Sequence, residues 1–221
     1  MQKDIMRFIA LDFDGTCAHF DAGGSRGWFS IFVHRGIPKA HLEDIYRRIR
    51  EQGFSIKNFL DELQTKIERE LDRQEICREF EQWLGRSLSL YTDVIPAIQE
   101  WQKAGIPIFV LSAGEPEYQM QKIKTSGIPY DRAMLMPQPL GKAEVFKKLL
   151  GVYGEPAIII DDRSDILDET RRMLQDRHVI TAWIQRPGSE YAHGEAKFFH
   201  IKADSLNAPQ VRKVILGERN G

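Results

Sequence analysis

The feature that most constrains the fold is an apolar run near the start of the chain that ends abruptly in carboxylates. Residues 8–11 are Phe-Ile-Ala-Leu, and the sequence D-F-D-G-T follows at positions 12–16. The run is too short to cross a membrane and suits a strand that is buried on both faces. Ionised carboxylates beside an apolar core must be paired or bound to a metal ion. We therefore expect Asp12 and Asp14 to form a hard-cation site at the end of a strand, although a plain strand followed by an Asp-Gly turn also accounts for this stretch alone.

Downstream of residue 90 the pattern alternates between short apolar runs and helical periodicity. Strands are expected at 106–111, 133–136, 157–160 and 179–184, with a weak one at 198–201, and helices at 94–104, 115–126, 142–150, 166–174 and 209–216. Asp93 is expected to cap the first of these helices. This alternation is typical of a parallel sheet covered on both faces, so we expect a Rossmann-like α/β core.

Polar residues follow several of these expected strands. Asp12, Ser112 and the pair Asp161-Asp162 all stand where a strand ends. In α/β folds of this kind ligands bind beyond the carboxyl ends of the strands. The pattern therefore predicts that these side chains share one site.

The segment between the first strand and residue 89 differs from the rest. Apolar residues recur at helical spacing from Trp28 to Leu84, and Ser55 is placed to cap a helix after a break at 52–55. We expect three or four helices here. The predicted organisation is an α/β core from residues 1–18 and 89–221, interrupted by a helical insert at 19–88.

Composition excludes several classes of protein. The chain has 221 residues, a net charge of −1 and two cysteines, Cys17 and Cys77, that lie far apart in sequence. A near-neutral charge gives no reason to expect a nucleic acid partner. Two distant cysteines indicate neither a zinc site nor a disulfide framework, and residues 1–4 are polar, so we expect a cytoplasmic protein without signal peptide or membrane span. No oligomeric state follows from these patterns.

Four motifs in order resemble the haloacid dehalogenase-like (HAD) hydrolase superfamily, and the resemblance covers essentially the whole chain. They are D-F-D-G-T at 12–16, Ser112 in I-F-V-L-S-A-G, Lys142 in P-L-G-K-A-E-V-F, and Asp161-Asp162 in A-I-I-I-D-D-R-S-D. The resemblance implies a Rossmann-like core with a small all-helical cap domain inserted after the first motif. It also implies a Mg²⁺-dependent phosphatase that acts on a small phosphorylated metabolite through an aspartyl-phosphate.

The resemblance assigns roles to the acidic residues. Asp12 would be the nucleophile, and Asp14 would be the general acid and then the general base. Mg²⁺ would be held by Asp12, the backbone carbonyl of Asp14, and Asp162, with Asp161 as the alternative or additional ligand. Thr16 and Asp165 are expected to support these ligands by hydrogen bonding. Asp165 as a simple helix cap is the alternative for that residue.

The phosphoryl group would be bound by Ser112, by the backbone N–H groups of Ala113 and Gly114 at the start of the next helix, and by Lys142. Relatives often have proline after this lysine, whereas Ala143 follows here. Two other lysines on the same helix, at positions 147 and 148, therefore stay open as alternatives.

Other functions share these motifs. A phosphomutase uses all four, and a non-catalytic binding protein could keep the same fold. Relatives that displace halide lack the second aspartate, so the presence of Asp14 disfavours dehalogenation. Within the insert, Lys57 and Arg26 are candidate substrate contacts, although a surface charge is the simpler interpretation of both.

Overall fold

A computed structural model describes residues 6–21, 24, 26–187, 189, 191, 195 and 197–217. The polar residues 1–4 considered above lie outside the described part. The chain divides into two compact units. The α/β unit takes its residues from 1–19, 90–113 and 128–221, and the helical unit takes its residues from 20–89 and 114–127.

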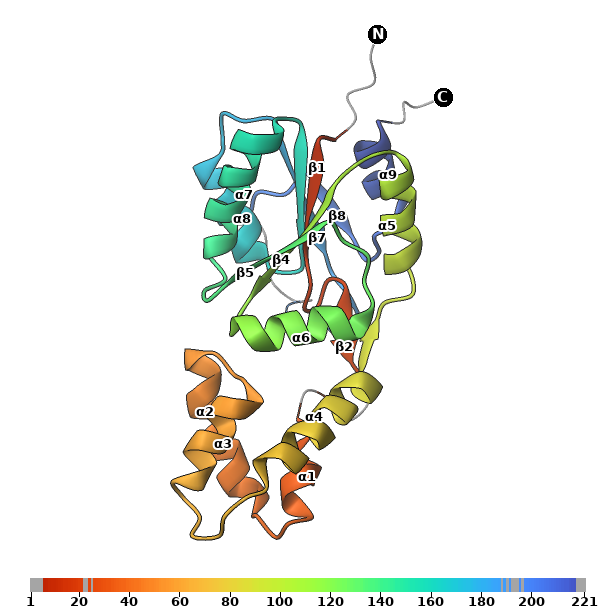
Figure 1. Cartoon of the computed structure of the whole chain (residues 1–221). Coiled ribbons are helices and arrows are strands. Elements are labelled where there is room, and N and C mark those ends of the chain that lie inside the picture. The colour runs from red at the N-terminus through yellow and green to blue at the C-terminus, as the bar shows by residue number, and fades with distance from the viewer. Residues whose placement is uncertain are drawn as a thin grey trace. The chain divides into compact units, whose positions relative to one another are not determined.

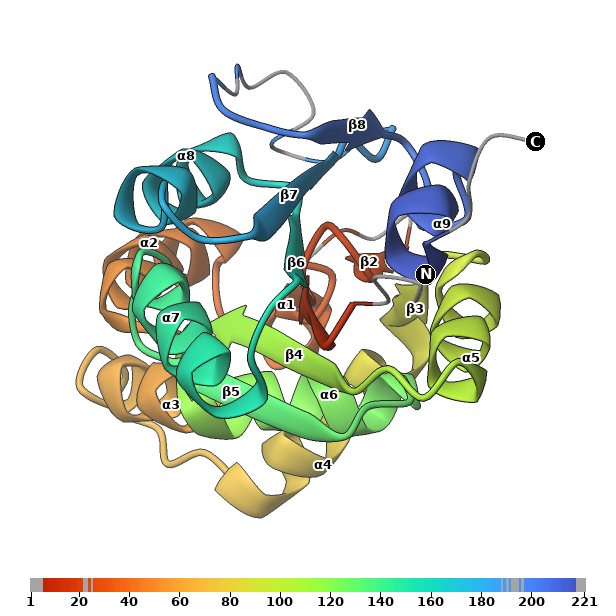
Figure 2. The same cartoon turned by 90° about the horizontal axis from the view of Figure 1, so that it is seen from above.

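The α/β unit is built on a six-stranded sheet in which every pair of neighbouring strands is parallel (Figure 2). Its strands are β1 (Phe8–Asp12), β4 (Ile108–Ala113), β5 (Arg132–Met136), β6 (Ala157–Asp161), β7 (Val179–Ile184) and β8 (Ile201–Ala203), in the order β5-β4-β1-β6-β7-β8. All residues of β1 and β6 are buried, as expected for apolar strands at the centre of a parallel sheet. The prediction of a Rossmann-like α/β fold is confirmed.

Helices cover both faces of this sheet. Helices α7 (Gly141–Tyr153) and α8 (Ser164–Met173) lie on one face, and α5 (Val94–Lys103) and α9 (Pro209–Leu216) lie on the other (Figure 1). Buried side chains such as Phe8, Phe109 and Phe146 fill the layer beneath α7 and α8. The last expected strand, at 198–201, lies further along the chain, since β8 begins at Ile201 and residues 197–200 belong to no helix or strand.

The helical unit contains α1 (Phe29–Val33), α2 (Lys39–Gln52), α3 (Ile56–Gln64), α4 (Arg73–Ser87) and α6 (Pro116–Ser126). Trp28 is fully buried at its centre, with the rings of Phe29, Phe59 and Phe80 at centroid distances of 4.6, 4.7 and 5.6 Å. Such ring contacts add to the large area that each aromatic side chain buries. An aromatic core therefore holds this unit together.

Helix α6 is counted with the α/β core in the sequence analysis, but it packs within the helical unit. Its residue Tyr118 contacts the rings of Phe54 and Phe80 at 5.0 and 5.9 Å. Its residue Glu117 forms an ion pair with Lys57 of α3. These contacts join residues about 40 to 60 positions apart in sequence, and periodicity within one segment does not indicate such contacts.

Two short strands are not predicted from the sequence. Strands β2 (Ala18–Phe20) and β3 (Leu88–Leu90) form a separate two-stranded sheet. The chain passes from one unit to the other within each of them. Three residues are too few for an alternating pattern to stand out, so the sequence gives no signal for either strand.

No helix among the residues that the structure describes combines the length and the apolar character needed to cross a membrane.

Candidate active site

The turn that follows β1 brings the first motif into a compact loop. The N–H groups of Cys17 and Ala18 both donate to the carbonyl of Phe13, and the N–H of Gly15 donates to the carbonyl of Ala18. Gly15 has a φ of +83°, which favours glycine. A Cβ atom at this position would overlap the carboxylate of Asp162. Glycine is therefore needed both for the turn and for its close approach to that carboxylate.

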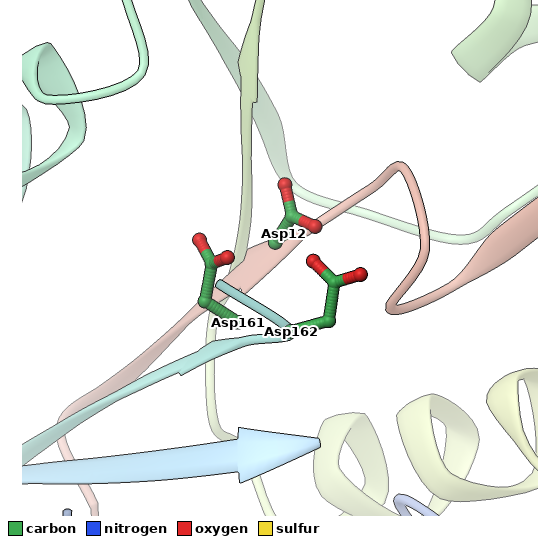
Figure 3. Close-up of side chains that lie close together, drawn as sticks. All are labelled: Asp12, Asp161 and Asp162. Carbon is green, nitrogen blue, oxygen red and sulfur yellow. The ribbon is translucent and has the colours of Figure 1, made fainter. Parts of the chain in front are cut away.

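Three carboxylates meet where the two central strands end. Leu11 of β1 is paired with Ile160 of β6, so the next residues, Asp12 and Asp161, end their strands at the same level. Asp12, Asp161 and Asp162 are 5%, 0% and 1% exposed. Each offers one carboxylate oxygen within 4.8 Å of those of the other two, and Figure 3 shows the three groups gathered together. Two segments almost 150 residues apart in sequence thus form one acidic cluster.

Lys142 supplies positive charge to this cluster. It is the second residue of α7 and is 3% exposed. Its Nζ atom donates to Asp12 and, at 2.8 Å, to Asp161. Lys147 and Lys148 of the same helix are exposed, so the structure places Lys142, and not the two alternatives, against the acidic residues.

The remaining oxygen atoms of the cluster suit a hard cation. The Oδ1 of Asp161 accepts from the N–H of Arg163, and the Oδ2 of Asp162 accepts from the hydroxyl of Ser189 at 2.8 Å. The Oδ1 of Asp162 and the Oγ1 of Thr16 are buried and have no hydrogen-bond partner among the described residues. Buried oxygens of this kind call for a ligand, and an all-oxygen set is what Mg²⁺ prefers. The residues present therefore fit a hard divalent cation.

The electrostatics of the cluster point the same way. Burial and the charge of Asp161 raise the pKa of Asp12 well above its ordinary value, against the opposing effect of Lys142. Burial and Asp161 also raise the pKa of Asp162 to about 7. Burial alone would lower the pKa of Lys142, but Asp12 and Asp161 hold it above its ordinary value. One ammonium does not neutralise three buried carboxylates, and a bound cation would favour their ionised forms.

The residues predicted to bind a phosphoryl group lie at the end of β4. Ser112 is 1% exposed, and Leu111 beside it is paired with Asp12. Ala113 is the last residue of β4, and Gly114 lies two residues before α6 begins at Pro116. The N–H groups of these two residues thus precede the helix, and its own first-turn N–H groups donate to the side chain of Glu115. A role for these N–H groups in phosphate binding stays a prediction.

Two of the expected supporting residues behave differently from each other. The carboxylate of Asp165 accepts hydrogen bonds from the guanidinium of Arg163, at 3.1 and 2.6 Å, and its side chain is 54% exposed. These contacts give no support to the prediction that Asp165 orients the metal ligands, because its carboxylate forms an ion pair with Arg163 at the surface. Thr16 lies fully buried in the turn, as its place in the motif suggests, with the unpartnered hydroxyl described above.

Three residues near the cluster have no part in the sequence analysis. Ser189 donates to Asp162, and the indole N–H of Trp183 donates to the backbone carbonyl of Asp162 at 2.9 Å. The Nε of Arg186 donates to the carbonyl of Thr16 at 3.0 Å. Trp183 belongs to β7, and Arg186 and Ser189 follow it. The sequence of this stretch indicates only a strand with a polar segment after it. No spacing within that stretch distinguishes these side chains from surface residues.

Comparison with solved structures identifies the fold. A protein from Burkholderia xenovorans LB400, assigned as a haloacid dehalogenase-like hydrolase, is similar with a TM-score of 0.69 and 15% identity over 97% of this chain and 96% of that one. A defluorinating L-2-haloacid dehalogenase gives 0.64 and 19%, with coverages of 94% and 95%. A protein from Thermotoga maritima, assigned as a β-phosphoglucomutase, gives 0.56 and 12%, with coverages of 95% and 97%. At such identities the likeness establishes the fold alone.

Sequence comparison establishes the family. No protein with a curated description matches this sequence significantly. The model of the haloacid dehalogenase-like hydrolases, however, matches residues 6–167, which is well over half of the chain and includes both halves of the acidic cluster. The chain belongs to the haloacid dehalogenase-like hydrolase family.

Proposed function

We propose that this hydrolase is a Mg²⁺-dependent phosphatase that acts on a small phosphate monoester through an aspartyl-phosphate intermediate. The observation that carries the proposal is the buried cluster of Asp12, Asp161 and Asp162 with Lys142 against two of its members. Phosphoryl transfer needs an aligned nucleophile and positive charge around the transferring oxygens. The cluster offers a nucleophile, an ammonium and a cation site within one small space.

In the first step of the proposed reaction, a carboxylate oxygen of Asp12 attacks phosphorus and the bond from phosphorus to the ester oxygen breaks. Asp14, which is half-buried two residues away, gives its proton to the departing oxygen. In the second step a water molecule attacks the phosphorus and gives a proton back to Asp14, while the bond to Asp12 breaks. The products are an alcohol and inorganic phosphate.

Lys142 and the cation are both proposed to supply positive charge to the reacting groups. The ammonium of Lys142 holds Asp12 in place and neutralises charge beside it. Mg²⁺, when bound, supplies positive charge that offsets the negative charge of the phosphoryl group. We assign the cation to Asp12, Asp162 and the backbone carbonyl of Asp14. Asp162 is the principal ligand from its pair, because its Oδ1 is unpartnered within the described part whereas both oxygens of Asp161 accept hydrogen bonds.

Dehalogenation is the competing chemistry, since L-2-haloacid dehalogenases are among the structural relatives. A departing halide is a weak base and requires no proton, so that reaction has no need of an acid at the position of Asp14. The substrate would also bring a carboxylate toward three carboxylates already buried together. Both arguments favour a phosphate ester. By its place in the chain, the helical unit is proposed to act as the cap of this family.

The proposal is tested by measuring release of inorganic phosphate from p-nitrophenyl phosphate and from a panel of small phosphate esters. We expect turnover with Mg²⁺, loss of turnover with a chelator, and recovery when Mg²⁺ is returned. Replacement of the nucleophile in Asp12→Asn should lower kcat by at least about 10⁴-fold while the circular dichroism spectrum is unchanged.

Other outcomes separate the alternatives. Isomerisation of a sugar phosphate without release of phosphate would replace the phosphatase with a mutase. Halide release from 2-haloacids, with no phosphate release from any ester, would favour a dehalogenase. Binding of phosphate esters without turnover of any kind would leave a binding protein on the same fold.

A further inference from the structure

Arg186 is a buried cation that forms a hydrogen bond with the turn at 13–18. It belongs to none of the four motifs. It lies two residues after β7 and is 3% exposed. Its Nε donates to the carbonyl of Thr16 at 3.0 Å, and its Nη1 donates to the carbonyl of Asp204, also at 3.0 Å. Its Nη2 is buried without a partner among the described residues. A protein interior tolerates a charged group in this state only where other contacts offset the loss of hydration.

Asp93 is the contact that holds Arg186 in the interior. Its Oδ1 lies 3.0 Å from the Nη1 of Arg186, and its Oδ2 accepts from the hydroxyl of Ser205 and the N–H of Leu206. Burial would raise the pKa of Asp93, but these bonds hold it below its ordinary value. Asp93 occupies the N-cap position of α5, yet its side chain makes no cap hydrogen bond. The expected cap is therefore absent because the carboxylate binds the arginine.

Tyr91 completes the arrangement. The guanidinium of Arg186 lies 4.3 Å from the centroid of its ring, and the backbone N–H of Tyr91 donates to the carbonyl of Cys17. The carbonyls of two successive residues, Thr16 and Cys17, are thus held by one cluster, made of Arg186, Tyr91 and Asp93. This cluster ties the turn at 13–18 to the end of β7 and the start of α5.

We propose that Arg186 is a positioning residue for Asp14, and that it acts by fixing the turn on which Asp14 stands. The proposal rests on the proposed phosphatase function, in which Asp14 protonates the departing oxygen. Asp14 is two residues from the carbonyl that Arg186 holds, within a turn closed by the hydrogen bonds at Phe13 and Ala18. Small displacements of a catalytic group have large kinetic effects, since an error of about 1 Å can lower a rate by about 10²-fold.

The chemistry of the leaving group separates positioning from a general structural role. An aryl oxide such as p-nitrophenolate is a weak base and departs without a proton. An alkoxide is a strong base and departs only when an acid protonates it. Misplacement of Asp14 therefore slows the cleavage of alkyl phosphates much more than that of aryl phosphates. Partial unfolding, in contrast, lowers both rates by the same factor.

The experiment compares kcat/KM for p-nitrophenyl phosphate with kcat/KM for the best alkyl phosphate of the wild type, both with saturating Mg²⁺. For Arg186→Met we expect the alkyl value to fall about 10- to 100-fold more than the aryl value. Arg186→Lys should recover part of the difference, because its ammonium can still donate to one carbonyl. The matched control is Arg212→Met, which removes another arginine–carboxylate pair of the α/β unit, that with Glu100, and should leave the ratio unchanged.

Two further variants complete the test. In the background of Asp14→Asn, Arg186→Met should have no additional effect on the ratio, because its target is already gone. If Arg186→Met does not fold, Asp93→Asn removes the ion pair instead and is expected to change the ratio in the same direction. Equal loss for both esters, or an unchanged ratio, in a wild type that hydrolyses both would overturn the positioning role alone. Absence of phosphate release from every ester in the wild type would overturn the proposed function, and this inference with it.

Discussion

The two units of the molecule bury different kinds of side chain. Among the described residues of the α/β unit, those buried and polar or charged are Asp12, Thr16, Ser112, Lys142, Asp161, Asp162, Thr170, Thr181 and Arg186. In the helical unit they are Gln119 and Lys122, both on α6. The described residues from 20 to 89 bury none. The α/β unit thus retains groups that are costly to bury, whereas the described side chains buried between residues 20 and 89 are apolar or aromatic.

This contrast indicates where chemistry and where stability are concentrated. Buried polar groups that cluster at strand ends, some without partners, are expected at sites that bind ligands and rarely improve stability by themselves. Rings packed around a buried tryptophan are expected to stabilise a unit through the large area that they bury. Substitutions of the buried polar groups in the α/β unit should therefore mainly lower activity, whereas substitutions in the core of the helical unit should mainly lower stability.

The largest effect is expected for Lys142→Met, which keeps much of the side chain's volume and removes its charge. Because Lys142 is the ammonium bonded to Asp12 and Asp161, we expect kcat for a phosphate ester to fall about 10²- to 10³-fold. The measurement is steady-state phosphate release with saturating Mg²⁺, with circular dichroism to verify the fold. Lys147→Met is the matched control, since that exposed lysine lies on the same helix. A kcat for Lys142→Met near that of the wild type would contradict the role of this ammonium.

In the helical unit, the strongest test of the contrast is Trp28→Ala. Trp28 is fully buried against neighbouring rings, so its truncation leaves a cavity that should lower the stability of this unit by about 3–5 kcal/mol. Hydrogen exchange followed by mass spectrometry should show lost protection in α1 to α4 and retained protection in β1, β4 and β6. Val33→Ala, at a 44% exposed position of α1, should change stability by less than about 0.5 kcal/mol. Equal loss of protection in the sheet would mean that the two units unfold as one.

A smaller effect, specific to the α/β unit, is the pH dependence of stabilisation by Mg²⁺. The pKa of Asp162 is about 7 in the folded protein, against an ordinary value of 3.8. Between these values the folded protein holds a proton that the unfolded chain has lost, so stability without Mg²⁺ falls as the pH rises through this range. Mg²⁺ binds the ionised carboxylates and offsets that loss. Mg²⁺ should therefore stabilise the protein more at pH 8 than at pH 5, by roughly 2 kcal/mol.

Thermal unfolding at both pH values, with Mg²⁺ and with a chelator, measures this difference. Asp162→Asn serves as the control, because an amide does not titrate and should make the Mg²⁺ effect smaller and nearly independent of pH. The same increase in Tm at pH 5 and pH 8 in the wild type would show that the cation does not bind at these carboxylates.

The sequence could predict features that depend on neighbouring residues, but not contacts between residues far apart in the chain. The apolar strands, the helices of the α/β unit and the residues that end the strands were all predictable, because a parallel sheet brings the carboxyl ends of its strands to one edge. The acidic cluster follows from that topology. Arg186, Ser189 and Trp183 were not predictable, because their partners Thr16 and Asp162 are between 21 and 170 residues away in sequence. Asp93 and Ser55 show the limit clearly, since both have the sequence signature of a cap and only one of them caps.

The smallest expected effect uses this pair of helix starts. Ser55 caps α3 in full, because its hydroxyl accepts from the N–H of Asn58 while the side chain of Asn58 accepts from the N–H of Ser55. Ser55→Ala removes the first bond and should lower stability by about 1 kcal/mol, whereas Ser55→Asp keeps an acceptor and should restore most of it. Urea unfolding gives the two free energies. Since these bonds are local to the helical unit, kcat measured well below the unfolding transition should not change. A lower kcat in Ser55→Ala would mean that the start of α3 takes part in the reaction, and that packing is not the whole contribution of this unit.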